Sequence, residues 1–313
     1  MTIYAWARRR TFPALPTPEA LYFDVADDAR VLAHAYWQPS PPAAGTLLAL
    51  HGLEGSSSAH YMRGLADKAF RRGLNVVLLN QRNCGGTERL SKGLYHSGLT
   101  DDPAFVMRHL RAELGLDRFG VVGYSLGGNL TLKLTAEASI SGDLPVVAAC
   151  AVSPTMDLAR CVDALERKSN LVYQLNFVRN LRSRMRRKAA FWPDEYDISV
   201  LKGVWTVRKF DDALTAPYHG FRDAADYYHR ASALRVIDRI ARPTLIISAA
   251  NDPFVPPDQF RRSEVLGNPH VSTIVTPDGG HCAFVAEDTD DYDGYWAEEA
   301  AVRFVTARLA AAG

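Results

Sequence analysis

Five short, uninterrupted apolar runs constrain the fold of this 313-residue chain more than any other feature. A strand can be apolar at every position only when both of its faces are buried, as in a parallel sheet covered by helices. Segments with helical spacing, such as 61–72 and 104–114, separate the runs. The sequence therefore predicts an α/β fold of repeated βαβ units, with a mostly parallel central sheet flanked by helices. The five runs are Thr46–Leu50, Asn75–Leu79, Phe119–Val122, Leu144–Val152 and Thr244–Ser248, and we expect a two-stranded start over 21–37, a last strand over 271–275 and a closing helix over 295–312.

The alternation stops between residues 156 and 238, where charged segments with helical spacing take over. We predict a helical cap insertion there, so that 1–155 and 239–313 are the two parts of one core and 156–238 is the cap. A cap covers and shapes a pocket. Its aromatic residues are expected either to line that pocket or to form the cap's own core; they are Tyr173, Phe177, Phe191, Trp192 and Trp205.

One cap segment has an amphipathic pattern, because apolar residues recur every three or four positions from Leu171 to Met185. Basic residues occupy the rest of this helix. They are expected to form either a solvated face or a surface for peripheral contact with membrane lipid. The basic residues are Arg179, Arg182, Arg184, Arg186, Arg187 and Lys188.

Composition excludes several classes of function. A formal net charge of +1 argues against bulk nucleic-acid binding, and no window of the sequence approaches 18 consecutive apolar residues. The first fifteen residues contain no apolar stretch typical of a secretion signal. The cysteines, Cys84, Cys150, Cys161 and Cys282, include no CxxC pair and suit reduced thiols. We therefore expect a cytoplasmic protein without a metal.

The most informative motif is Gly123–Gly128, which reads GYSLGG between the apolar run 119–122 and the helix-like segment 129–134. Strand, G-x-S-x-G and helix in this order are typical of a nucleophile elbow, whose tight turn requires glycine around the serine. The Ser125 hydroxyl then stands clear of the sheet and can attack a carbonyl carbon. The alternative interpretation is a tight turn with an idle serine.

A nucleophilic serine needs a base and an orienting carboxylate, which α/β-hydrolases supply in the chain order Ser, Asp or Glu, His. Asp252 follows the apolar run 244–248, and His281 lies on a glycine-containing loop after 271–275. We expect His281 to accept the Ser125 proton and Asp252 to orient the imidazole. Asp278 is the competing carboxylate, although its position favours a turn residue.

The oxyanion hole is expected to combine two backbone N–H groups. Leu126, directly after the nucleophile, supplies one. Leu53, in the loop His51–Gly55 that follows an early strand, supplies the other. Glu54 in the same loop is interpreted as a solvated or capping residue, with a catalytic acid as the alternative.

Several motifs together resemble the YheT-like branch of the α/β-hydrolases, from about Leu47 to His281. They are His51–Ser56, Asn80–Gly86, Tyr95–Asp101, Gly123–Asn129, Phe210–Pro217 and Asn251–Phe254. The resemblance implies an α/β-hydrolase fold and esterase or lipase activity on carboxylic esters, with no metal or organic cofactor. It also places the family's triad on Ser125, Asp252 and His281. One departure is Asn83, which stands where the family usually has glycine.

Other motifs are weaker. His96 and Asp101 match the His-x4-Asp spacing of some acyltransferases, but a hydrogen bond within the loop is the preferred interpretation. The acidic segment 288–294 does not fit a calcium loop, because Tyr292 falls at a ligand position and Asp293 where glycine is required. No phosphate-loop, zinc-helix or dinucleotide motif is present.

The sequence as a whole predicts a serine hydrolase that cleaves carboxylic esters, as a short-chain carboxylesterase or a monoacylglycerol-type lipase, through an acyl-enzyme on Ser125. The expected partner is a small ester with an apolar acyl group. Two alternatives remain open: acyl transfer by the same triad, and a catalytically silent hydrolase fold that only binds.

Overall fold

A computed structural model describes residue 8, residues 10–289 and residues 292–313. Its centre is an eight-stranded sheet in the order β1-β2-β4-β3-β5-β6-β7-β8. The first two strands are antiparallel, β2 is antiparallel to β4, and all later pairs are parallel. The strands are β1 (Glu19–Ala26), β2 (Ala29–Tyr36), β3 (Thr46–Leu50), β4 (Asn75–Asn80), β5 (Phe119–Tyr124), β6 (Val146–Val152), β7 (Thr244–Ala249) and β8 (Val271–Thr276).

Helices cover both faces of this sheet. One face packs against α2 (His60–Arg71) and α11 (Trp296–Ala311), and the other against α3 (Asp101–Leu114) and α4 (Leu126–Ser141). Strands β3 to β7 have every residue buried except Val147, which is why their sequences are apolar runs rather than alternating ones. This arrangement is the α/β-hydrolase fold expected from the sequence.

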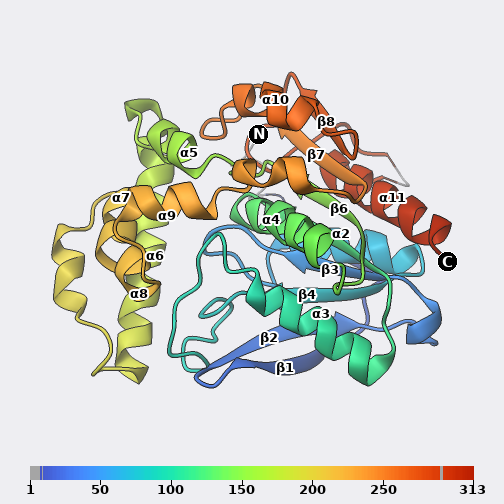
Figure 1. Cartoon of the computed structure of the whole chain (residues 1–313), viewed down its shortest axis with the longest axis horizontal. Coiled ribbons are helices and arrows are strands. Elements are labelled where there is room, and N and C mark those ends of the chain that lie inside the picture. The colour runs from blue at the N-terminus through green and yellow to red at the C-terminus, as the bar shows by residue number, and fades with distance from the viewer. Residues whose placement is uncertain (1–7, 9, 290–291) are drawn as a thin grey trace.

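The segment between β6 and β7 is helical and lies to one side of the sheet, on the left in Figure 1. Its longest element, α6, buries only the later part of its apolar stripe: Val178, Leu181 and Met185 are buried, whereas Leu171 and Leu175 at the start of the helix are exposed. The placement supports the cap at 156–238, and the division into domains stays a prediction. The helices are α5 (Leu158–Leu165), α6 (Leu171–Phe191), α7 (Val207–Phe210), α8 (Ala216–Tyr218) and α9 (Ala224–Ala231), and α10 (Ser263–Leu266) follows β7.

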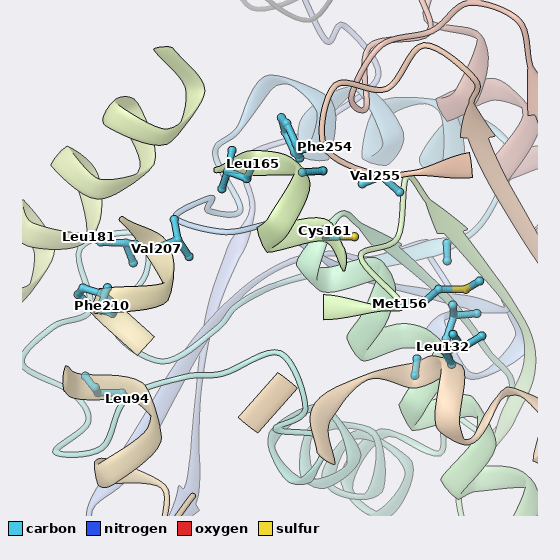
Figure 2. Close-up of a cluster of buried hydrophobic side chains, with 14 of the residues drawn as sticks. Leu94, Leu132, Met156, Cys161, Leu165, Leu181, Val207, Phe210, Phe254 and Val255 are labelled. Carbon is cyan, nitrogen blue, oxygen red and sulfur yellow. The ribbon is translucent and has the colours of Figure 1, made fainter. Parts of the chain in front are cut away.

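The cap and the core share one hydrophobic cluster, shown in Figure 2. Leu165 of α5, Leu181 of α6 and Phe210 of α7 belong to it, together with Phe254 and Val255 from the loop after β7. Burying an aliphatic or aromatic side chain contributes about 1.5–3 kcal/mol each. The cap is therefore held against the ends of the strands by apolar contacts. Within the described ranges, no helix is both long and apolar enough to cross a membrane.

Candidate active site

Ser125 sits in the sharp turn between β5 and α4, with φ 54° and ψ −116°. A non-glycine residue with positive φ is strained, and such strain occurs mostly at functional positions. The neighbouring glycines have no space for a side chain: a Cβ on Gly127 would lie 2.3 Å from the Leu50 carbonyl oxygen, and one on Gly123 would lie 2.1 Å from the Gly127 carbonyl oxygen. The two glycines thus let the turn close and present the serine.

The structure brings Ser125, His281 and Asp252 into one hydrogen-bonded line. His281 Nε2 lies 2.8 Å from Ser125 Oγ, and His281 Nδ1 lies 2.9 Å from Asp252 Oδ2. The three residues follow β5, β8 and β7, whose carboxyl ends meet at one edge of the sheet. Asp278, the competing carboxylate, is exposed and accepts a hydrogen bond from Asn251 instead.

The loop after β7 fixes both Asp252 and the imidazole. Asp252 Oδ1 accepts hydrogen bonds from the backbone N–H groups of Phe254 and Val255, at 3.1 and 3.0 Å. The Phe254 ring packs on His281, with 4.1 Å between ring centroids, and Tyr173 and Phe177 of α6 contact Phe254 edge-on. Sequence reasoning missed the role of Phe254, because nothing in the chain pattern shows which rings will stack.

The environment of His281 makes it a strong base. Burial lowers the pKa of His281, but the adjacent Cys282, the charge of Asp252 and the hydrogen bond with Asp252 raise that pKa by more. The net result is a pKa above the value of an exposed imidazole. A raised pKa strengthens the attraction of the imidazole for the serine proton, provided that the ring is neutral.

The expected oxyanion donors, Leu53 and Leu126, line the same cavity as Ser125. In the loop after β3, the N–H of Gly52 donates to the Tyr61 hydroxyl at 3.1 Å and the N–H of Glu54 donates to the Tyr95 hydroxyl at 3.0 Å. The Leu53 N–H between them has no acceptor in the part of the chain that the structure describes. The same holds for Leu126, the first residue of α4, where helix N–H groups carry partial positive charge.

His51 stabilises this loop and takes no part in the hydrogen-bonded line. Burial lowers the pKa of His51 to about 4, so its ring is neutral. His51 Nε2 accepts a hydrogen bond from the Gln81 N–H at 3.1 Å, and its Nδ1 lies 2.8 Å from the Gly52 carbonyl oxygen, to which it donates. The sequence does not reveal these roles of His51, Tyr61 and Tyr95, because no local pattern shows which backbone group a buried ring or hydroxyl will reach, whether 9 residues away, as for Tyr61, or 41, as for Tyr95.

Glu54 is neither solvated nor a cap, which corrects the sequence interpretation. Its Oε1 accepts hydrogen bonds from Arg184 Nε at 2.7 Å and from the Tyr95 hydroxyl at 3.0 Å. The side chains of Arg184 and Glu54 are only 4% and 7% exposed. Since α6 carries Arg184, a buried ion pair joins the cap to the residue next to Leu53.

The basic residues of α6 do not form one solvated face either. Besides Arg184, Lys188 is fully buried and donates to Asn83 Oδ1 at 2.7 Å and to the Ser91 carbonyl oxygen. Burial lowers the pKa of Lys188 to about 7. Asn83 has φ 66°, a conformation that glycine and asparagine adopt with least strain. Asparagine in place of the family's glycine thus keeps the turn and adds an acceptor for Lys188.

Two cavities meet at Ser125. The inner one, of about 90 Å³, lies under the cap and is lined mostly by apolar residues, including Leu126, Cys161, Leu165 and Phe210. The outer one, of about 320 Å³, contains His281, Cys282, Tyr61 and Val172. Leu53, Phe177 and Phe254 border both.

Some aromatic residues of the cap line a cavity, one packs in the cap's core, and two lie on the surface. Tyr173 lines the outer cavity and Phe177 both cavities. Trp192 packs against the buried cluster and donates its indole N–H to the Glu88 carbonyl oxygen. Phe191 and Trp205 are 56% and 59% exposed, so for these two the expectation of a pocket or core position was wrong.

The remaining motifs have structural partners. His96 Nδ1 accepts a hydrogen bond from the Gly98 N–H, while Asp101 is exposed at the start of α3, and no hydrogen bond between them exists in the described structure. In the acidic segment, Asp288 pairs with Arg8 and Asp293 with Arg10 and Lys68; Asp290 and Asp291 lie outside the described residues. No group of metal-ligating side chains that could hold an ion is found among the residues described.

Comparison with known proteins agrees with this architecture. The sequence model of the alpha/beta hydrolase fold family matches residues 45–288. YheT of Escherichia coli (strain K12), which is named as a candidate esterase, is 39% identical over 254 residues, covering 80% of this chain and 74% of that protein. A monoacylglycerol lipase of Saccharomyces cerevisiae is 28% identical, covering 79% of this chain and 58% of the lipase.

Among solved structures, the esterase Pf2001 of Pyrococcus furiosus superposes with a TM-score of 0.63, covering 97% of this chain and 96% of that one. Its sequence identity of 17% supports the fold alone. The family match and the similarity to YheT also establish the family. This chain belongs to the α/β-hydrolase fold family, within the group of esterases and lipases that resemble YheT.

Proposed function

We propose that the protein hydrolyses carboxylic esters through an acyl-enzyme on Ser125. The observation that carries the proposal is the line from Ser125 Oγ to His281 Nε2 and from His281 Nδ1 to Asp252, with separations of 2.8 and 2.9 Å. In this scheme Ser125 Oγ bonds to the acyl carbon while its proton passes to His281. The N–H groups of Leu53 and Leu126 stabilise the negative oxygen that forms.

The intermediate then breaks down in two stages. The C–O bond to the alcohol breaks, and His281 gives its proton to the departing oxygen. A water molecule, deprotonated by the same imidazole, attacks the acyl-enzyme and releases the acid and free Ser125. Asp252 keeps Nε2 directed at the serine and stabilises the imidazolium throughout.

The two cavities suggest how an ester lies in the site. His281 must reach the departing oxygen, and it borders the outer cavity but not the inner one. We therefore assign the alcohol part to the outer cavity and the acyl part to the inner one. Because the inner cavity is the smaller and is lined by apolar side chains, the favoured substrate has a short apolar acyl group.

A chain-length series tests this assignment. We expect kcat/KM for 4-nitrophenyl butyrate to exceed that for the palmitate ester by about tenfold or more, since a small apolar pocket discriminates by 10- to 200-fold per misfitting group. Leu165→Phe, which fills the inner cavity, should shift the preference toward acetate. Asn176→Phe, in the outer cavity, should instead penalise bulky alcohols at constant acyl length. The reverse pattern would exchange the two assignments.

Covalent labelling tests the mechanism itself. A fluorophosphonate probe reacts only with an activated nucleophile, so we expect the wild-type protein to take up one label and Ser125→Ala to take up none. An unreactive wild-type protein would indicate a silent hydrolase fold. If labelling occurs but an added alcohol captures most of the acyl group as a new ester, the reaction is acyl transfer rather than hydrolysis.

We also propose a cytoplasmic location. All four cysteines are free, and Cys84, Cys150 and Cys161 are buried. Thiols that remain unpaired suit a reducing compartment. A fractionation of cells that express the full-length chain would test this.

A further inference from the structure

The N-terminal half of α6 exposes large aliphatic side chains next to the candidate active site. Leu171, Val172 and Leu175 are 54%, 71% and 50% exposed. Leu171 and Leu175 lie one turn apart on the same side of the helix. Exposed aliphatic residues gathered in this way mark an interaction site more often than residues scattered singly.

Basic residues precede and follow these aliphatic side chains along the chain. The chain contains no Asp or Glu from Arg167 to Pro193. Arg184 and Arg187 pair with Glu54 and Glu88, and Lys188 is buried. The other basic residues of this stretch form no ion pair within the described structure; they are Arg167, Lys168, Arg179, Arg182 and Arg186.

Arg182 has partners within the cap, the Val204 carbonyl oxygen and the Trp205 ring, but the side chains of Lys168, Arg179 and Arg186 have no such stabilising contact within the described structure. Lys168 lies in the short turn Lys168–Asn170 before α6, whose first turn holds no acidic residue, and a cation is unfavourable at the positive end of the helix dipole. Arg179 and Arg186 are exposed on the same side of the helix as Leu175. Arg182 lies three residues from Arg179 and four residues from Arg186, and like charges at such spacing repel one another. Their arrangement is better explained by a partner that carries negative charge.

The exposed part of α6 also lies at the entrance to the candidate active site. Val172 and Asn176 are exposed and at the same time line the outer cavity, which contains Ser125 and His281. The outer cavity therefore reaches solvent at the N-terminal half of α6, beside Val172 and Asn176. A molecule that docks there is placed directly at the mouth of the outer cavity.

We propose that this face docks on anionic phospholipid bilayers and takes lipophilic esters from them into the outer cavity. The α6 surface consists of Arg167, Lys168, Leu171, Val172, Leu175, Arg179 and Arg186. Its arginine and lysine side chains attract lipid phosphates, while its leucines and valine enter the boundary between headgroups and acyl chains. The delivery of esters rests on the proposed function, whereas the docking does not.

A bilayer fits these features better than a nucleic acid does. Nucleic-acid surfaces are recognised by basic and polar side chains with stacking aromatic rings, not by aliphatic residues at the centre of the contact. The net charge of the whole chain is only +1, so the positive field is local to this face. Trp205, exposed and within 4.8 Å of the Arg182 guanidinium, adds a side chain suited to the lipid headgroup layer.

Vesicle flotation with the full-length protein tests the docking. We expect binding to vesicles of phosphatidylcholine with 30% phosphatidylglycerol, at roughly tenfold or higher affinity than to pure phosphatidylcholine. Arg179→Glu/Arg186→Glu should weaken binding by roughly thirtyfold or more, the loss expected for two basic residues near an anionic surface. Leu171→Ser/Leu175→Ser should also weaken it, and binding that remains should become more sensitive to salt.

Matched variants elsewhere control for general changes in charge and polarity. Arg239→Glu/Arg303→Glu and Ile140→Ser/Leu266→Ser alter exposed residues outside α6 and should leave flotation unchanged. All four double variants should hydrolyse a water-soluble ester within about twofold of the wild-type rate, which also shows that they fold.

The outcomes separate docking from catalysis. If the wild-type protein hydrolyses soluble esters but does not float with anionic vesicles, or floats equally well after the α6 changes, the docking proposal is wrong and the proposed function stands. If it floats but hydrolyses nothing, the proposed function fails and the docking stands. Retention on heparin or DNA without binding to vesicles would also overturn the docking.

Discussion

Ser125→Ala is expected to reduce kcat for 4-nitrophenyl butyrate by about 10⁵- to 10⁶-fold. Removal of the nucleophile from a serine triad typically costs this much, because the remaining base cannot form an acyl-enzyme and only the oxyanion donors and substrate binding still act. Alanine fits the same backbone turn, so the elbow should keep its shape. Steady-state rates above the spontaneous hydrolysis of the ester provide the measurement.

The control for this variant is Ser58→Ala, in the loop that follows Leu53, the proposed oxyanion donor. Ser58 is exposed, and among the described residues its hydroxyl forms a hydrogen bond only with that of Ser56. Its removal should change kcat by less than about twofold. If Ser125→Ala kept more than a tenth of the wild-type rate while remaining folded, another group would have to be the nucleophile.

Asp252→Asn is expected to lower kcat by about 10⁴-fold with little change in structure. The asparagine Oδ1 can still accept the hydrogen bonds from Phe254 and Val255 that Asp252 Oδ1 accepts now. Its amide group would face His281 Nδ1 and favour the tautomer in which Nε2 carries the proton. That tautomer cannot accept the proton of Ser125.

The pH profile adds a second readout for this variant. His281 acts as a base only when neutral, so the rate rises with pH through the pKa of His281. The Asp252 carboxylate raises that pKa, so Asp252→Asn should move the rising limb of kcat/KM to lower pH. Asp278→Asn, on the His281 loop but paired with Asn251, should leave both rate and profile nearly unchanged. A large loss in Asp278→Asn with a small one in Asp252→Asn would reverse the assignment of the carboxylate.

Most of the core could be predicted from sequence because local pattern and burial agree there. The expected strand over 46–50 matches β3, and the runs at 75–79 and 244–248 each extend by one residue in the structure. The closing helix begins at Trp296, one residue later than expected. Side chains at the strand ends could be placed near one another because parallel strands end at one edge of the sheet.

The surroundings of the site could not be predicted in the same way. Glu54 and Arg184 are 130 residues apart, and a charged residue taken alone is expected at the surface. Their burial follows from where α6 lies over the loop after β3, which depends on the packing of the whole cap. Phe191 and Trp205 differ in the opposite direction. Their aromatic side chains predict burial, but both are exposed in the structure.

The ion pair between Arg184 and Glu54 limits how the cap can move. Swinging α6 away would separate this pair, uncover Lys188 and expose the buried Val178, Leu181 and Met185, and each of these apolar side chains loses about 1.5–3 kcal/mol when it leaves the core. A state that unfavourable has a population below about one per cent. Bulky esters would then have to enter through an opening of fixed size beside Val172. No hinged movement of the cap would limit the rate of turnover.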